Sequence, residues 1–115
     1  KAGSMLGSGA VMVMDDSRDM VETLQRLSYF YMHESCGQCT PCREGTGWLW
    51  RMVHRIQNGQ GRPEDLAKLD NVAENIMGRT ICALGDAAAM PVRAMLKHFR
   101  HEFAAKIDAA VKAAA

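Results

Sequence analysis

The chain has 115 residues, of which 48% are apolar and 23% charged, a composition typical of one globular domain and not of a disordered segment. The 14 lysines and arginines against 13 aspartates and glutamates leave a formal net charge of +1. No basic run with interleaved aromatic residues points to nucleic acid, and no apolar segment approaches the length of a membrane span. No signal peptide is recognised either, so we expect neither nucleic-acid binding nor direct membrane insertion.

The first sixteen residues, KAGSMLGSGAVMVMDD, join a glycine- and serine-rich stretch to a short apolar run at 10–14. The run predicts a β-strand, but a lone strand can neither bury one face nor satisfy its edges. We therefore expect residues 1–16 to be the end of an upstream domain or a linker. Gly3, Gly7 and Gly9 are expected to form a plain turn, since the strand and helix that flank a nucleotide-binding loop are missing around them.

Two helices are predicted in the first half of the remaining chain. The first has its N-cap at Asp16 or Ser17 and runs to about His33, because apolar residues recur there at helical spacing. The second begins near Arg43 or Glu44 and stops at Asn58–Gly59, a good C-terminal signal. The two predicted apolar stripes are Met20, Val21, Leu24, Leu27 and Tyr31 in the first helix, and Trp48, Leu49, Met52, Val53 and Ile56 in the second.

Two further helices are predicted after residue 62. The third starts at Pro63, a favoured first-turn residue, and ends at Gly78. A short irregular connection, RTICALGD, leads to a fourth helix with Pro91 near its first turn. The predicted stripes are Leu66, Leu69, Val72, Ala73 and Ile76, and then Val92, Met95, Leu96, Phe99 and Phe103. The sequence thus predicts an all-α fold, a small four-helix bundle at 17–104 followed by an alanine-rich tail at 105–115 that either prolongs the last helix or frays.

Four cysteines carry the strongest functional signal. Cys36, Cys39 and Cys42 lie within seven residues, and Cys82 follows 40 positions after Cys42. In a chain without a secretory signal, such cysteines are better read as metal ligands than as disulfides. Structural zinc sites usually take two pairs of ligands, whereas C-x-x-C-x-x-C with one remote cysteine is typical of a 4Fe–4S cluster. The pattern therefore favours a 4Fe–4S cluster over zinc.

The neighbours of these cysteines suit such a cluster. Gly37 allows the backbone to turn beside it, and the loop leads into a helix whose N-terminal end carries partial positive charge. Arg43 is either a solvated arginine or a cation that tunes the reduction potential. With four cysteine ligands no iron is left open for substrate, which favours electron transfer, although a purely structural cluster stays possible. We find no catalytic arrangement of Ser/His/Asp or Cys/His.

For the tryptophans and for two of the histidines the sequence predicts ordinary structural positions. Trp48 is predicted to lie in the core, and Trp50 on the opposite side of the helix, at a surface or an interface. His98 and His101 are three apart on the fourth predicted helix and have the spacing to meet one metal ion, but ordinary surface histidines are the better reading.

ESCGQCTPCREG at 34–45, followed by ICALGDAAAMPV at 81–92, resembles the C-terminal iron–sulfur domain of the flavoprotein subunit of NADH:quinone oxidoreductase, or respiratory complex I. Similar domains occur in the flavoprotein subunits of NAD-reducing hydrogenases and NAD-dependent formate dehydrogenases. The resemblance covers essentially the whole chain. It implies that residues 1–16 end a β-grasp domain and that Cys36, Cys39, Cys42 and Cys82 ligate the cluster.

The resemblance further implies that NADH reduces FMN in the upstream part of the subunit. The cluster would take single electrons from FMN and pass them to further iron–sulfur subunits of the peripheral arm, toward quinone. Nothing in this chain matches the family's glycine-rich FMN and NADH sites, so we expect the chain alone to lack dehydrogenase activity. In a bacterium the parent complex would place it at the cytoplasmic face of the inner membrane. A zinc-stabilised interaction domain, and the same domain in a hydrogenase or formate dehydrogenase, are the alternatives.

Overall fold

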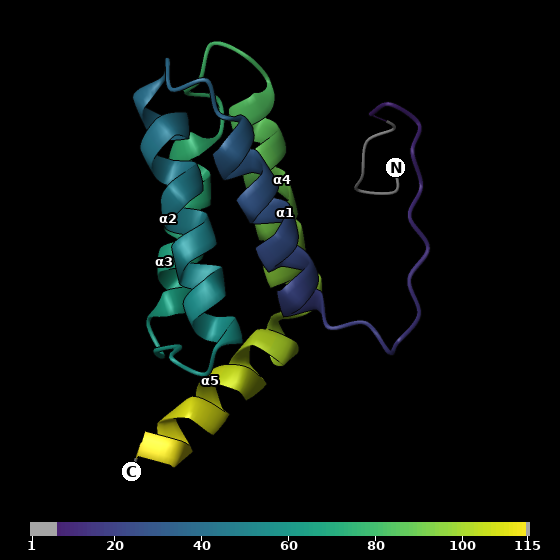
Figure 1. The fold of residues 1–115 in the computed structure, drawn as a ribbon, viewed down its shortest axis with the longest axis vertical. Coiled ribbons are helices and arrows are strands. Elements are labelled where there is room, and N and C mark those ends of the chain that lie inside the picture. The colour runs from purple at the N-terminus through teal and green to yellow at the C-terminus, as the bar shows by residue number, and fades with distance from the viewer. Residues whose placement is uncertain (1–6, 115) are drawn as a thin grey trace.

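The computed structural model describes residues 7–114, in which five helices form and no strand does. The helices are α1 (Met20–Glu34), α2 (Thr40–Gln57), α3 (Asp65–Ile76), α4 (Leu84–His98) and α5 (Arg100–Ala114). α1 packs against α2, α2 against α3, α3 against α4, and α4 returns to α1. The predicted all-α four-helix bundle is therefore confirmed, with α5 leaving its lower end in Figure 1.

The core is made from one buried stripe on each helix. Leu24, Leu49, Leu69 and Val92 are fully or almost fully buried, one from each helix of the bundle. Close packing of α2 on α3 depends on Gly45, because a Cβ there would lie 2.7 Å from Ile76 side-chain carbons. The complete cluster of buried core residues is Val21, Leu24, Leu49, Val53, Ile56, Leu66, Leu69, Ala73, Ile76, Ala89, Val92, Leu96, Phe103 and Ile107.

The prediction of a single fourth helix at the end of the chain is wrong. α4 begins at Leu84, seven residues before Pro91, and ends at His98; Phe99 then breaks the helix with φ −122° and ψ 21°. The early start was missed because Ala88 and Ala89, though buried, carry too little apolar surface to mark a stripe. Pro91 lies inside α4 rather than in its first turn.

The alanine-rich tail prolongs the last helix, since α5 continues to Ala114 and the predicted boundary at residue 104 falls inside it. Phe103 and Ile107 of α5 are buried in the core. Polar contacts hold α5 against the start of α1: the Lys106 amine lies 2.7 Å from an Asp19 carboxylate oxygen, and the Met20 N–H donates to Glu102. Asp19, not Asp16 or Ser17, is the N-cap of α1 and accepts from two backbone N–H groups.

The strand predicted at 10–14 is not formed. In the described part of the segment, residues 7–16, the chain runs apart from the bundle, and Val13 is 93% exposed. No partner strand exists within residues 7–114, and an unpaired strand is unstable. Gly7 and Gly9 have positive φ angles in the expected turn, whereas Gly3 lies outside the described residues.

Candidate metal centre

The cysteines lie on two connections that meet at one end of the bundle, and in the first turn of α2 that follows one of them. The α1–α2 connection carries Cys36 and Cys39, and the α3–α4 connection carries Cys82; both are at the upper end of the bundle in Figure 1. Antiparallel helices bring these segments together although they are more than 40 residues apart. The backbone N–H of Ile81 donates to the Cys39 sulfur at 3.4 Å, which ties the two connections directly.

Helix α2 begins inside the cysteine motif, earlier than predicted. Cys39 is its N-cap and Thr40 its first residue, so Cys42 lies in the first turn and not in the loop. Pro41 sits in that turn, where its missing N–H costs nothing because the first helical N–H groups have no intrahelical partner. The prediction of a start at Arg43 or Glu44 was therefore wrong by three or four residues.

The four thiols surround one cavity. Its volume is about 120 Å³, and its lining residues are Glu34, Ser35, Cys36, Gln38, Cys39, Cys42, Thr80, Cys82 and Leu84. All four cysteines are free thiols, of which Cys42 is buried, Cys39 half-buried, and Cys36 and Cys82 exposed. The structure thus brings together every cysteine that the sequence singled out.

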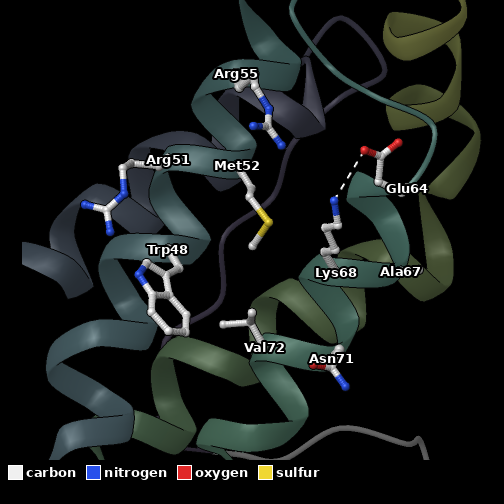
Figure 2. Close-up of a pocket in the computed structure, with 9 residues that line it drawn as sticks. All are labelled: Trp48, Arg51, Met52, Arg55, Glu64, Ala67, Lys68, Asn71 and Val72. Carbon is white, nitrogen blue, oxygen red and sulfur yellow. Dashed lines mark hydrogen bonds and ion pairs between the residues drawn. The ribbon is translucent and has the colours of Figure 1, made fainter.

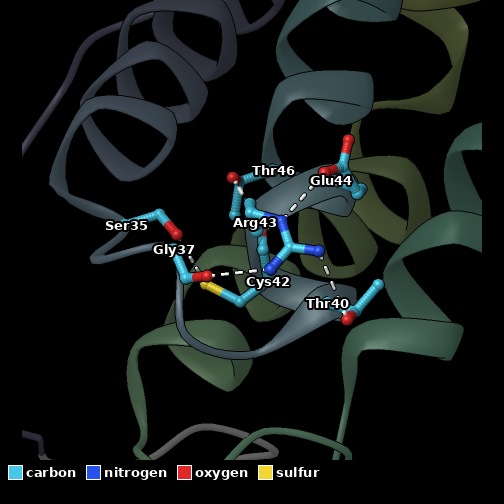
Figure 3. A network of polar contacts seen from close by, with 7 residues as sticks. All are labelled: Ser35, Gly37, Thr40, Cys42, Arg43, Glu44 and Thr46. Atoms are coloured by element: carbon cyan, nitrogen blue, oxygen red, sulfur yellow. Dashed lines mark hydrogen bonds and ion pairs between the residues drawn. The ribbon is translucent and has the colours of Figure 1, made fainter.

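Gly37 and Arg43 are joined by a hydrogen bond (Figure 3). Gly37 has φ +81°, the left-handed conformation that glycine adopts without strain. The Arg43 guanidinium donates to the Gly37 carbonyl at 2.9 Å and to the Thr40 hydroxyl at 3.4 Å. It also pairs with Glu44 at 3.0 Å, so part of its charge is neutralised locally. These contacts make Arg43 a brace of the loop, and its influence on a bound group stays a prediction.

Three hydroxyl residues that the sequence analysis did not single out support the cysteines. The Ser35 hydroxyl lies 3.2 Å from the Cys42 sulfur. Thr46 donates to the Cys42 carbonyl at 2.8 Å, and Thr80 to the Cys82 carbonyl at 2.9 Å. Ser35 directly precedes Cys36 in the sequence, Thr80 lies two residues before Cys82, and Thr46 follows Cys42 by one helical turn. This closeness to the cysteines is the signal in the sequence that could have identified the three hydroxyl residues.

No site for a single metal ion is recognised among the described residues, the four cysteines included. Within residues 7–114, no group of three or more histidine, cysteine, aspartate or glutamate side chains is arranged to hold a single ion. His98 is the last residue of α4 and His101 the second of α5, and both are exposed. The break at Phe99 thus removes the one-helix arrangement in which the two histidines were predicted to lie.

No helix among the described residues combines the length and apolar character needed to cross a lipid bilayer.

A helical bundle whose four cysteine thiols line one cavity has the composition of a small metal-binding domain. The family model described as "NADH-ubiquinone oxidoreductase-F iron-sulfur binding region" matches residues 22–106, and the chain belongs to this family. Its cofactor is a 4Fe–4S cluster. The predicted family resemblance is confirmed.

Individual relatives agree with the family. The chain is 56% identical over 106 residues to the F subunit of NADH-quinone oxidoreductase from Rickettsia massiliae (strain Mtu5), covering 92% of this chain and 25% of the relative. It is 55% identical over 107 residues to the F subunit from Rickettsia bellii (strain OSU 85-389), covering 93% of this chain and 26% of the relative. The chain therefore spans about a quarter of the length of these curated relatives.

Solved structures show the same fold. An NAD+-reducing [NiFe]-hydrogenase in the H2-reduced state matches with a TM-score of 0.80 and 38% identity, over 85% of this chain and 17% of that chain. An NAD+-reducing [NiFe]-hydrogenase in the air-oxidized state matches with a TM-score of 0.78 and 37% identity, over 83% of this chain and 17% of that chain.

Proposed function

We propose that Cys36, Cys39, Cys42 and Cys82 ligate one 4Fe–4S cluster, and that the chain is an electron-transfer domain of an NADH:quinone oxidoreductase. The observation that carries the proposal is the convergence of all four thiols on one cavity of about 120 Å³. Membership of an iron–sulfur binding family supports it. When bound, such a cluster supplies one-electron transfer at a potential set by its surroundings.

The arrangement of the thiols favours a cluster over a zinc ion. A zinc ion needs its four ligand atoms within about 2.0–2.3 Å of one point. All four cysteines border a common space, three of them from one short segment and the fourth from the distant α3–α4 connection. A multi-iron cluster holds each thiolate at a different corner, so ligands arranged around a space suit it better than ligands converging on one atom.

The chain's own groups would stabilise the negative charge of a thiolate-bound cluster. The first turn of α2 directs partial positive charge toward the site from Cys39 onward. The Ile81 N–H and the Ser35 hydroxyl lie within hydrogen-bond distance of two of the sulfurs. Hydrogen bonds to cluster sulfurs favour the reduced, more negative state. Exposed Cys36 and Cys82 leave one side of the site open toward a redox partner.

We extend the proposal to the parent protein by its relatives. Identities of 55–56% to the F subunit of NADH-quinone oxidoreductase, against 38% to an NAD+-reducing hydrogenase, favour the quinone-reducing complex as the parent. There, FMN and NADH would bind upstream of this region, and other iron–sulfur subunits would accept the electrons. The subunits that purify with the parent protein distinguish this assignment from a hydrogenase or formate dehydrogenase.

Anaerobic reconstitution tests the cluster. We expect about four irons and four sulfides per chain and an EPR signal after reduction. The Cys82→Ser variant should lose or convert the cluster while keeping most of its helical circular dichroism, and the Ser35→Ala variant, which removes no ligand, should retain four irons. One zinc per chain with no paramagnetic signal would establish the zinc-stabilised interaction domain instead. Loss of all helical signal in Cys82→Ser would show that the cluster is structural.

A further inference from the structure

A long groove runs between α2 and α3, and it shares no lining residue with the cavity of the four cysteines. Its larger part, about 720 Å³, is shown in Figure 2 and is bordered by residues from Trp48 to Arg55 of α2 and from Glu64 to Val72 on the α3 side. A second part of about 390 Å³ continues toward Thr40 at the start of α2. The two parts share Trp48, Asn71 and Val72 and therefore form one groove.

The length of the groove suits a polypeptide segment. It follows α2 from Thr40 to Arg55, which corresponds to roughly 22 Å at 1.5 Å per residue. Small molecules are instead held in cavities that enclose most of their surface. A helix of about four turns has the right length to lie along α2 and α3.

Trp48 stands where the two parts of the groove meet. Contrary to the sequence prediction, its side chain is not in the core but 51% exposed. In Figure 2 the indole lies on the same side of α2 as Met52, opposite Val72 of α3. An exposed indole above an apolar floor resembles the aromatic anchors that carry most of the binding energy at protein interfaces.

The charges at the rim are positive on balance. Four cations border the groove, Arg51, Arg55, Lys68 and Arg79, against the two acids Glu44 and Glu64. Lys68 pairs with Glu64, and Arg55 pairs with buried Asp65. In contrast, no ion pair is found for Arg51 or Arg79 anywhere in residues 7–114.

The position of Arg51 is defined by its own helix. Its guanidinium lies over Gly47, one turn toward the start of α2, where it is 3.4 Å from the place that a Cβ would occupy. This puts the cation next to Trp48, on the rim of the larger part. Arg79 borders the smaller part, so each part of the groove has one guanidinium without an acid partner in the described chain.

We propose that this groove docks an acidic amphipathic helix from another subunit of the parent enzyme. Its apolar face would cover Trp48, Met52 and Val72, and its carboxylates would pair with Arg51 and Arg79. A second copy of this chain fits poorly, because a symmetric contact buries the same patch on both copies and sets two surfaces of net positive charge against each other. The inference rests on the proposed parent enzyme but not on the cluster, since neither Trp48 nor Arg51 lines the cavity of the four thiols.

Site-specific photo-crosslinking in the assembled parent enzyme tests the occupant. A benzoylphenylalanine in place of Trp48 should crosslink to one peptide of another subunit, with a net negative charge and apolar residues at helical spacing. The same photo-reactive residue in place of Phe30, which is also 51% exposed but lies on α1, is the matched control and should not yield that peptide. A crosslink to a second copy, to this chain itself, or to a neutral or basic segment would overturn the proposal, as would no crosslink.

A charge reversal tests the electrostatic part. Arg51→Glu should weaken association of the parent subunit with the rest of the enzyme at least tenfold at low salt, and the difference from wild type should shrink as salt rises. Arg26→Glu makes the same charge change on α1 and should change the affinity less than threefold. The cluster EPR signal should be the same in both variants and in the wild type. A loss of the signal would show that the substitution damages the metal centre, which is distinct from an effect on docking at the groove. Equal affinities for Arg51→Glu and wild type would refute the docking site.

Discussion

The backbone N–H of Ile81 donates a hydrogen bond to the sulfur of Cys39 across 42 positions of sequence. The contact joins the α3–α4 connection to the N-cap of α2, so it holds the remote part of the cysteine site against the clustered part. The side chain of Ile81 is 85% exposed and therefore contributes little packing. The contribution of this residue to the site comes from its main chain.

Removing that N–H should lower the reduction potential of a cluster held by the four cysteines. We expect Ile81→Pro to shift the midpoint by roughly 20–60 mV to more negative values, because a hydrogen bond contributes about 0.5–1.5 kcal/mol and 59 mV corresponds to a factor of ten for one electron. Ile81→Ala keeps the N–H and should shift it by less than about 10 mV by the same conversion. Redox titration followed by EPR measures both, and equal midpoints for the two variants would contradict the role of the bond.

Two glycines in α2 should respond in opposite ways to alanine. Gly45→Ala would place a Cβ 2.7 Å from Ile76 carbons in the core, so we expect a loss of about 1–3 kcal/mol in the free energy of unfolding. At Gly47 the nearest atoms are 3.4 Å away, on the flexible end of Arg51. Gly47→Ala should therefore be neutral or stabilising by up to about 1 kcal/mol, since alanine favours helix. Urea denaturation of both variants and of the wild type measures these changes in the free energy of unfolding. A Gly45→Ala variant more stable than wild type would disprove close packing of α2 on α3.

The buried carboxylate of Asp65 should make Arg55 important for stability. Asp65 is 0% exposed and accepts hydrogen bonds from the Arg55 guanidinium and from the Arg62 N–H at 2.8 Å. Arg55→Met would leave that charge buried without its counterion, which typically costs about 3–5 kcal/mol. Arg51→Met, one turn earlier in α2, removes no ion pair and should cost less than about 0.5 kcal/mol.

A double variant separates the lost pair from lost packing. Replacing Asp65 by leucine together with Arg55→Met removes both charges and should recover part of the stability that Arg55→Met alone loses, because no unpaired charge stays buried. Denaturant unfolding of the four proteins in this cycle gives the coupling free energy. Strictly additive losses would show that the pair contributes no interaction of its own.

Asp19 should make the docking of α5 sensitive to acid. Partial burial raises the pKa of its carboxyl, but hydrogen bonds from Lys106, the Glu22 N–H and Gln57, with the Lys106 charge, outweigh burial and hold the pKa below the ordinary 3.8. A carboxyl whose pKa is lower in the folded state stabilises the fold above its unfolded pKa. That stability is lost as the pH falls through the folded pKa, which places the loss below about pH 4.

The variant Asp19→Asn isolates this charge, because asparagine is also a good N-cap. At pH 7 it should be less stable than wild type by roughly 0.5–1 kcal/mol, the range for partly exposed ion pairs. The difference should shrink as the pH is lowered below about 4 and falls through the lowered pKa of the wild-type carboxyl, which then also loses its charge. Urea denaturation at several pH values measures this, and a difference independent of pH would exclude the ion pair with Lys106 as its source.

Helical periodicity was sufficient for the fold class and for most of the core. The apolar spacing around Leu24, Leu49 and Leu69 predicts the buried faces of α1, α2 and α3, because strongly apolar residues mark a stripe clearly. The same method failed at the start of α4, where the buried residues are alanines, and at Phe99, where the local sequence carries no helix-breaking residue. It also placed Trp48 in the core, since spacing alone does not tell how wide the buried face of a helix is.

The sequence by itself determined that four cysteines in a three-plus-one pattern are the chemically distinctive residues, because ligand spacing along a chain is a local property. Only the tertiary structure decided how they meet: antiparallel helices bring Cys82 to the end of the bundle where Cys39 caps α2, and a main-chain N–H from Ile81 completes the contact. The groove beside Trp48 is likewise a product of packing, because it exists only where the surfaces of α2 and α3 diverge. Contacts between residues distant in sequence depend on the relative placement of whole helices, which no local pattern encodes.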